Sequence, residues 1–414
     1  MFEVLAARTF RKLFAAQVVA LLGTGLLTVA LALLAYDVSG SDAGAVLGTA
    51  LAIKMVAYVI GVPVMSAVAV NVPRRALLVC ADGVRAAIAI LLPFVDQAWQ
   101  LYVLIFVLQA ASATFTPTFQ SIIPSVLPDE RDYTRALSLS RLAYDLESLA
   151  SPVIAALLLT VITYNSLFVG TALGFVVSAA LVVTTTLPLA QSLEPSGSLV
   201  SRIELGSRIM LTDPVLRALL ALNTAVAAAS AVVLVNTVVY VHGLLGGSSA
   251  AVALALAFFG AGSMAAAVCV PGLLDTYTER RLMVCGASIL PFGLGVTVAL
   301  LISSPGAALG WVIICVAWVI LGVGTSLVNT PSARLIRAGS TQRNRSQVFA
   351  AQFSLSHLCF LVTYLIAGWV GVQLSQVVAA ALLTVLATLA TTAAALMWPA
   401  AASRKREREP VPRT

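Results

Sequence analysis

Four ionisable side chains lie inside long apolar runs of this sequence, where charge is rare. Lys54 stands near the middle of the run 43–69, and His357 stands in the run 347–370. Asp145 and Glu147 lie two residues apart in the run 139–162. An ionisable group at the centre of a membrane-spanning helix costs about 2.5–3.5 kcal/mol on insertion scales, so it usually has a function. We expect these four residues to be the candidates for taking up and releasing a proton.

Each of these residues also has a purely structural interpretation. Burial disfavours the charged form of a lysine, so Lys54 is able to release a proton, but it also suits a carboxylate or a helix end as a partner. A histidine titrates near neutral pH, yet His357 can equally be held by a neighbouring backbone group. Asp145 and Glu147 are about 200° apart around a helix axis. We therefore expect one of them to face the interior and the other to pair with an arginine.

The composition indicates what surrounds these residues. Of the 414 residues, 60% are hydrophobic and 10% are charged. A soluble domain carries about 25% charged residues, so the surface of this chain must face lipid. Apolar runs longer than about 18 residues recur along the chain, and backbone groups in lipid must bond internally, so these runs are predicted to be helices. The five cysteines lack disulfide or zinc-ligand spacing and are interpreted as small buried residues.

We predict an all-α integral membrane protein with twelve transmembrane helices in two pseudo-symmetric six-helix bundles. The helices are expected over 13–36, 43–69, 76–95, 100–124, 139–162, 166–189, 216–241, 249–274, 282–303, 308–331, 347–370 and 375–398. Turn-forming residues separate them, such as Ser-Gly-Ser-Asp at 39–42. The expected domains are an N-terminal bundle over 1–189, a cytoplasmic linker over 190–215, a C-terminal bundle over 216–398 and a basic cytoplasmic tail over 399–414.

The basic residues predict the orientation of the helices. All lysines and arginines between the predicted helices fall on one side, whereas the loops of the other side carry only acids such as Asp37, Asp42 and Asp96. Cytoplasmic loops of membrane proteins are enriched in Lys and Arg. We therefore expect both termini to lie in the cytoplasm.

Two short motifs repeat between the halves of the chain. Pro-Arg-Arg at 73–75 follows the second apolar run, and Glu-Arg-Arg at 279–281 follows the eighth. Thr-Pro ends the fourth run at 116–117 and the tenth run at 330–331. Internal repeats of this kind are typical of secondary transporters.

On these motifs the sequence resembles the major facilitator superfamily over nearly its whole length. The stretch 69–75 looks like the superfamily's signature of a glycine and an aspartate followed by paired basic residues, and 272–281 looks like its second copy. Ser-Pro-Val-Ile-Ala-Ala at 151–156 is similar to the Gly-Pro-x-x-Gly-Gly motif associated with exporters. The stretches 116–142 and 329–371 resemble bacterial efflux permeases of the enterobactin-exporter and nickel-resistance type.

The resemblance implies positions for further residues, together with pairing expected from spacing. The candidates for a cytoplasmic gate are Arg74, Arg75, Asp82, Arg85, Arg141, Asp275, Arg280 and Arg281. Asp82 and Arg85 are interpreted as partners of the two arginines that precede them. Arg141 lies four residues before Asp145, the spacing of an ion pair on one helix face. The candidates for the substrate cavity are Thr24, Gln109, Phe115, Asn223, Trp318 and Asn329. The exporter-like motif comprises Ser151, Pro152, Ala155 and Ala156. The resemblance also places the helices of Lys54 and His357 opposite each other between the halves.

We predict a secondary active transporter of the bacterial cytoplasmic (inner) membrane, in which proton-coupled antiport exports a small amphipathic or chelating compound by alternating access. The sequence contains no nucleotide-binding P-loop, so we expect transport to be driven by an ion gradient or to be uniport down the gradient of the substrate. Alternatives left open are a proton-coupled uptake symporter, a metal-ion exporter and, more remotely, a non-transporting membrane sensor. We expect no enzymatic activity, cofactor, bound metal or nucleic acid, and a monomer whose partners are the substrate, protons and the lipid bilayer.

Overall fold

The computed structural model of this chain is helical throughout its regular structure and describes residues 2–68, 73–127, 129–185, 199–341 and 344–399. The helices of the first part are η1 (Phe2–Ala6), α1 (Arg8–Ser39), η2 (Gly40–Asp42), α2 (Ala43–Val68), α3 (Arg74–Leu91), η3 (Leu92–Phe94), α4 (Ala98–Val126), α5 (Glu130–Leu158) and α6 (Tyr164–Val183). Those of the second part are α7 (Leu199–Thr212), α8 (Pro214–Val238), η4 (Val239–Leu244), α9 (Ser249–Thr276), α10 (Glu279–Ser303), α11 (Ala307–Ala338), α12 (Arg345–Leu365), η5 (Ile366–Val370), α13 (Gly371–Gln373) and α14 (Gln376–Met397). The predicted all-α membrane fold is confirmed.

Each apolar run that the sequence predicts to cross the membrane coincides with a helix over most of its described length, but α5 ends at Leu158 and α6 at Val183, before the ends of the predicted runs 139–162 and 166–189. By length and apolar composition, the described residues contain nine candidate membrane spans. One of these, Arg8–Val59, takes in α1 together with most of α2. The total of twelve transmembrane helices therefore stays a prediction.

The chain divides into two compact units. The first comprises Met1–Ser196 together with Thr237–Ala257, and the second comprises Gly197–Asn236 and Phe258–Thr414. The segment 237–257, which holds η4 and the start of α9, thus packs with the first six long helices although it follows α8 in the chain. The predicted boundaries of the bundles, at 189 and 216, stay a prediction.

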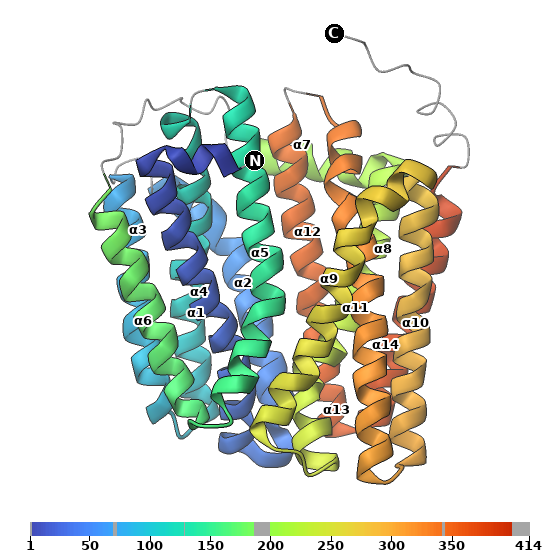
Figure 1. Cartoon of the computed structure of the whole chain (residues 1–414). Helices are drawn as coiled ribbons and strands as arrows, with labels where there is room; N and C mark the ends of the chain where they lie inside the picture. The colour runs from blue at the N-terminus through green and yellow to red at the C-terminus, as the bar shows by residue number, and fades with distance from the viewer. Residues whose placement is uncertain (1, 69–72, 128, 186–198, 342–343, 400–414) are drawn as a thin grey trace. The chain divides into compact units, whose positions relative to one another are not determined.

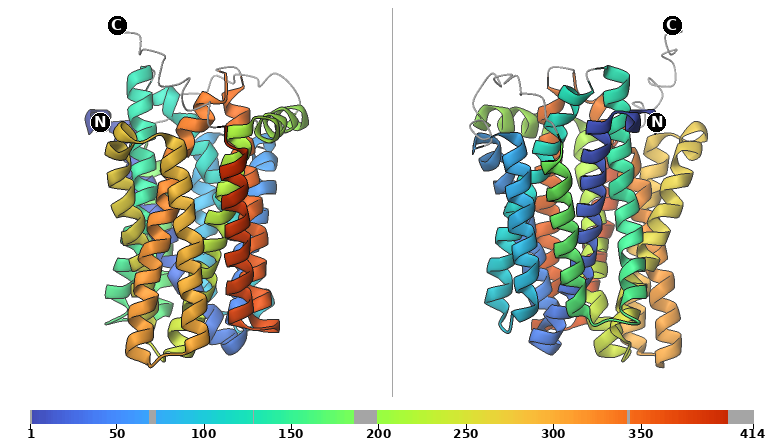
Figure 2. Two further views of the ribbon diagram at one scale, coloured as in Figure 1. Left: turned by 90° about the vertical axis from the view of Figure 1, so that its right-hand side faces the viewer. Right: turned by 60° about the vertical axis from the view of Figure 1, so that its left-hand side comes forward.

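In the first unit, α1 is the central helix and packs along α6, α5 and α2. Its contact with α6, visible in Figure 1 and in the right-hand view of Figure 2, depends on two glycines. Gly23 faces the backbone of Thr171, Gly174 faces the backbone of Val19, and the Thr171 hydroxyl donates to the Gly23 carbonyl over 2.9 Å. Small residues let two helix backbones approach closely in a membrane, where the hydrophobic effect does not drive helices together.

In the second unit, α10 packs on both α11 and α14, as the left-hand view of Figure 2 shows. Glycines again allow the contact, because Gly286 of α10 lies against Leu327, and Gly324 of α11 lies against Leu290. The contact between α9 and α11 is reciprocal. A Cβ atom at Gly322 would overlap the Phe259 carbonyl, and one at Gly262 would overlap the Val319 carbonyl.

The predicted linker contains a helix that the sequence pattern did not indicate. The helix α7 lies within the polar connector predicted over 190–215 and runs across α12 in Figure 1. It packs on α12 through Gly206, whose added Cβ would overlap the Gln347 carbonyl. Met210 is buried, whereas Glu204 and Arg208 are exposed. This division of one helix into a buried face and a charged face is typical of a surface helix.

The reciprocal glycine contact predicts a strong effect of a single methyl group. In Gly322→Ala, the new Cβ would meet backbone atoms of α9, including the Ser263 nitrogen at 2.9 Å, and backbone atoms cannot rotate away. We expect a loss of about 1–3 kcal/mol of unfolding free energy, the usual cost of overpacking. A lower unfolding temperature of the detergent-solubilised protein, followed by tryptophan fluorescence, measures this loss.

The matched control is Gly295→Ala on α10, because a Cβ at that position has no neighbouring atom within 4 Å. We expect its unfolding temperature to equal or slightly exceed that of the unchanged protein, since alanine favours a helix more than glycine does. Equal losses in the two variants would contradict the backbone contact as the cause.

Candidate functional site

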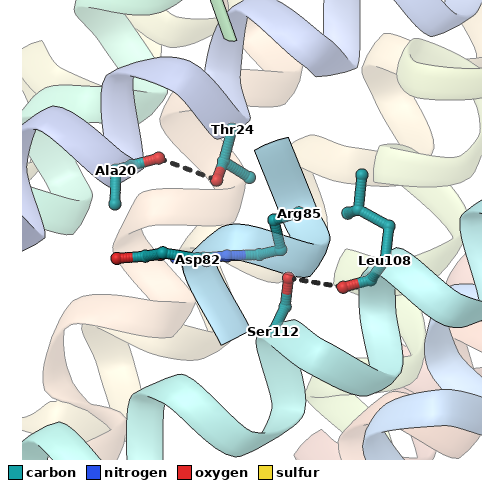
Figure 3. Close-up of polar contacts among 6 residues, drawn as sticks. All are labelled: Ala20, Thr24, Asp82, Arg85, Leu108 and Ser112. Carbon is teal, nitrogen blue, oxygen red and sulfur yellow. Dashed lines mark hydrogen bonds and ion pairs between the residues drawn. The ribbon is translucent and has the colours of Figure 1, made fainter. Parts of the chain in front are cut away.

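Arg85 is a buried cation at the place where α3, α4 and α6 meet. Its guanidinium group forms an ion pair with Asp82, one turn earlier on the same helix (Figure 3). The rings of Phe115 from α4 and Phe175 from α6 lie with their centres 4.6 Å and 4.2 Å from the guanidinium carbon. Arg85 is 5% exposed and Asp82 is 0% exposed. The positive charge is therefore neutralised by one carboxylate and covered by two ring faces, which attract cations.

Some polar atoms in and around this ion pair have no hydrogen-bond partner. Figure 3 also labels Thr24 of α1 and Ser112 of α4, and each hydroxyl donates over 2.9 Å to a carbonyl one turn earlier on its own helix. The second carboxylate oxygen of Asp82 and Nε of Arg85 are buried without a hydrogen-bond partner, and the Ser178 hydroxyl lies near the carboxylate without forming a well-aligned bond. Ordered water commonly satisfies buried groups of this kind.

The pairing of Asp82 corrects one expectation. The sequence suggests that Asp82 and Arg85 are partners of Arg74 and Arg75, whereas the structure pairs them with each other. The i,i+3 spacing puts both on one face of α3, where the two phenylalanine rings enclose them. Arg75 instead donates to the backbone carbonyl of Val183 at the end of α6.

A second pair of opposite charges lies between α2 and α5. Lys54 and Glu147, two of the four residues predicted for proton coupling, attract each other electrostatically. The ammonium group of Lys54 lies 5.9 Å from the centre of the Tyr58 ring, one turn further along α2. The phenol of Tyr58 lies within electrostatic range of both Glu147 and Arg85. Tyr58 therefore lies near both charge pairs of the first unit.

The Glu147 carboxylate lies against α1 at a glycine. A Cβ atom at Gly25 would lie 2.6 Å from Oε1 of Glu147 and would overlap the side chain of Ser151. Ser151, the first residue of the exporter-like motif, is 1% exposed, and Ala155 one turn later is fully buried. Only glycine at position 25 leaves room for both side chains of α5. Pro152 and Ala156 of the same motif are half-buried within the helix.

The other two residues predicted for proton coupling are placed differently. His357 belongs to the second unit, where its Nδ1 lies 2.6 Å from the Phe353 carbonyl and its ring centre lies 4.0 Å from that of Phe353. These contacts to its own helix match the structural interpretation of this histidine, and its predicted position opposite Lys54 stays a prediction. The side chains of Asp145 and Arg141 are outside the part of the chain whose side chains the structure describes.

The predicted gate residues of the second unit join the ends of three helices. Arg280 at the start of α10 donates over 3.0 Å to the Ala395 carbonyl of α14. Its neighbour Glu279 pairs with Arg334 of α11 over 3.4 Å. Asp275 and Arg281 are exposed. These contacts hold one end of the unit together, and the gate itself stays a prediction.

The six residues predicted for the substrate cavity differ in exposure. Gln109 and Asn223 are buried, and Thr24 and Asn329 are half-buried. Phe115 and Trp318 are 5% and 0% exposed. The Phe115 ring packs on Arg85, and the place of these six residues in a substrate cavity stays a prediction.

Several contacts between helices were not found from the sequence. In the second unit, the Asn236 amide of α8 donates over 2.7 Å to Gln376 and over 3.2 Å to the carbonyl of Ala367 in η5. The Thr363 hydroxyl of α12 donates over 3.1 Å to the Ala227 carbonyl of α8. The signal available was an amide or hydroxyl inside an apolar run, and such residues commonly bond neighbouring helices.

The enclosure of Arg85 predicts a large loss of stability when its carboxylate partner is neutralised. Asp82→Asn leaves a buried guanidinium charge without a counterion, which costs about 3–5 kcal/mol. We expect little folded protein to be recovered from membranes and a much lower unfolding temperature. The double variant Asp82→Asn/Arg85→Gln removes both charges and is expected to regain a large part of the loss, as thermal unfolding in detergent would show.

Asp132 and Arg135 on α5 provide the matched control, because they have the same spacing and form an ion pair of 3.2 Å with side chains 40% and 42% exposed. An exposed pair contributes about 0–1 kcal/mol, so Asp132→Asn should change the unfolding temperature little. Similar losses for Asp82→Asn and Asp132→Asn would show that burial of the charge is not the cause.

Comparison with known proteins supports a membrane transport function. Residues 13–315 match the sequence model of the Major Facilitator Superfamily. Macrolide efflux protein A of Streptococcus pyogenes is 24% identical over 196 residues, which are 45% of this chain and 48% of that protein. Macrolide efflux protein A of Enterococcus faecalis is 26% identical over 132 residues, 30% of this chain and 41% of that protein. The chain thus spans about half the length, or less, of the curated relatives it matches.

Solved structures with a similar fold cover nearly the whole chain. A bacterial homologue of the human lysosomal transporter Spinster matches with a TM-score of 0.72 and 13% identity, over 98% of each chain. The nucleoside transporter NupG matches with a TM-score of 0.70 and 11% identity, over 94% of this chain and 98% of that chain. A D-xylose–proton symporter matches with a TM-score of 0.70 and 13% identity, over 95% of this chain and 97% of that chain. At these identities the likeness concerns the fold. The match over residues 13–315 establishes that this chain, a multi-pass membrane protein, belongs to the Major Facilitator Superfamily.

Proposed function

We propose that this transporter exports a small amphipathic or lipophilic compound in exchange for protons, by alternating access. The observation that carries the proposal is the pair of opposite charges formed by Lys54 of α2 and Glu147 of α5 in the first unit, with Lys54 inside a candidate membrane span. Intramembrane ionisable residues commonly mark ion and proton pathways. The proposal retains the expected bundles over 1–189 and 216–398, cytoplasmic termini and a monomer.

Protonation of Glu147 is the step that would connect the proton to helix movement. The bound proton removes the negative charge that faces Lys54, so the attraction between α2 and α5 is lost. A ligand shifts a conformational equilibrium only as far as its affinity differs between the two states. The state in which Lys54 and Glu147 are close therefore favours the unprotonated carboxylate, and separation of the two helices favours proton uptake.

The relatives support export and a lipophilic substrate. Two proteins that match part of this chain are named for macrolide efflux. The predicted cavity residues are uncharged, and a binding site for an amphipathic compound is largely apolar with a small number of polar groups. Thr24 and Asn329, which are half-buried, are the polar residues that we assign to such a site.

Uptake by proton symport is the second candidate, because a D-xylose–proton symporter has the same fold. Fold alone does not give the direction of transport. Export of a metal ion is less favoured, since the described residues contain no group of three or more His, Cys, Asp or Glu side chains close enough to hold a metal.

The coupling site predicts a specific loss of proton exchange. In inside-out vesicles with an acidic interior, adding a macrolide to the wild-type protein should collapse the proton gradient, as a pH-sensitive dye reports. Glu147→Gln cannot bind and release the proton, and Lys54→Ala removes the charge that favours its release. We expect the initial rate of proton efflux to fall at least about tenfold in both variants, which corresponds to about 1.4 kcal/mol or more.

Glu204→Gln is the control, because this glutamate is exposed on α7, whereas Glu147 is half-buried and faces the charge of Lys54. Its rate should equal that of the wild type. A wild-type rate in Glu147→Gln would reject Glu147 as the coupling residue. Movement of radiolabelled macrolide without movement of protons would reject antiport, and proton efflux only from vesicles preloaded with the compound would favour symport.

A further inference from the structure

Gly25 of α1 is the point against which two side chains of α5 converge. Glu147 and Ser151 are separated by one helical turn, so they project from the same face of α5. A Cβ atom at Gly25 would lie 2.6 Å from Oε1 of Glu147 and would overlap both Oγ and Cβ of Ser151. The carboxylate oxygen and the hydroxyl therefore lie close to one point on the surface of α1. We call Gly25, Glu147 and Ser151 the glycine seat.

The hydroxyl of Ser151 has no hydrogen-bond partner in this arrangement. Its Oγ is buried, and the residue is 1% exposed. A serine inside a helix commonly donates to the carbonyl one turn earlier, as Ser112 of α4 does over 2.9 Å. An unsatisfied buried hydroxyl is costly, and a carboxylate is the strongest acceptor available to it. Within the glycine seat, this acceptor is the side chain of Glu147.

We propose that Ser151 is a positioning residue for Glu147, whose carboxylate alternates between the Lys54 ammonium and the Ser151 hydroxyl in the glycine seat. The inference rests on the proposed function, since it assigns a second partner to the residue that exchanges the proton. A hydroxyl donating to the carboxylate stabilises its ionised form, so Ser151 limits the rise in proton affinity that follows when the charge of Lys54 moves away. Gly25 is required because a side chain at position 25 would overlap Ser151 and the Glu147 carboxylate.

The charged and titratable groups around Glu147 are known for the described side chains. From α2 they are Lys54 and Tyr58, and the phenol of Tyr58 also interacts with Arg85 of α3. From α1 the contact is Gly25, which carries no charge. Ser151 therefore contributes a neutral donor to a carboxylate whose other described neighbours are a cation and a phenol.

Infrared difference spectroscopy of the purified protein tests the inference without any transport measurement. The C=O stretching band of protonated Glu147 is identified by its disappearance in Glu147→Gln. In Ser151→Ala we expect this band to move to higher frequency, because a hydrogen bond to the carboxyl group is lost. We also expect the band to persist to a pH on the order of one unit higher, since the ionised form loses a donor. Ser151→Cys keeps a weak donor of similar size and should give intermediate shifts.

Ser140→Ala is the matched control. Ser140 lies on the same helix, is 4% exposed and also has a buried hydroxyl without a partner. We expect its Glu147 band and titration to equal those of the wild type. An unchanged band in Ser151→Ala, or equal shifts in the two alanine variants, would overturn the assignment of Ser151. A shifted band in Ser151→Ala together with wild-type proton exchange in Glu147→Gln would support the Ser151 contact and reject proton coupling, so the two failures are distinguishable.

Discussion

A charge inside a lipid-facing helix bundle must be paired or covered, and the first unit of this transporter is arranged around that requirement. Arg85 is 5% exposed, so bulk water does not solvate its guanidinium group. Asp82 supplies the counter-charge from the same helix, and rings from α4 and α6 cover its two sides. Removing any one of these partners leaves a charge that the surrounding apolar residues cannot solvate. The contacts of one cation therefore join α3, α4 and α6.

Close approach of helix backbones shapes the surroundings of the ionisable groups in the first unit. Glycine provides this approach where α1 packs on α6 and on α5. Gly23 and Gly174 bring α1 against α6, and Gly25 leaves space on α1 for the Glu147 carboxylate. In a membrane, dispersion contacts and hydrogen bonds between helices must replace the hydrophobic effect, so close approach is a large part of the stabilisation. The same glycines that stabilise the unit thus define where its ionisable groups lie.

The two units differ in the chemistry of their interiors among the described side chains. The first has two pairs of opposite charges, Asp82 with Arg85 and Lys54 with Glu147. In the second, α8 is joined to η5 and α14 by the hydrogen bonds of Asn236, and to α12 by that of Thr363, and all of these groups are neutral. Electrostatic pairs respond to protonation, whereas amide and hydroxyl contacts persist over a wide pH range. The proposed proton exchange is therefore assigned to the first unit.

The sequence by itself determined the environment and class of this protein. With 60% hydrophobic residues and 10% charged residues, the chain can only fold with lipid around it, and its helices begin and end where turn-forming residues interrupt the apolar runs. The repeated Arg-Arg motifs and the exporter-like motif were sufficient to indicate the superfamily. Lys54 and Glu147 could be singled out as well, because the cost of an ionisable group in a membrane span is a property of the residue and its depth.

Only the tertiary structure decided which of these residues meet. Spacing along one helix suggested the contact of Asp82 with preceding arginines, but the rings of Phe115 and Phe175 that enclose it with Arg85 come from helices tens of residues away. Gly25 carries no chemical signal in the sequence, and its meaning depends on which face of α5 packs against α1. The helix α7 was missed because its stability comes from packing of Gly206 and Met210 in the second unit, and a local pattern does not contain that contact.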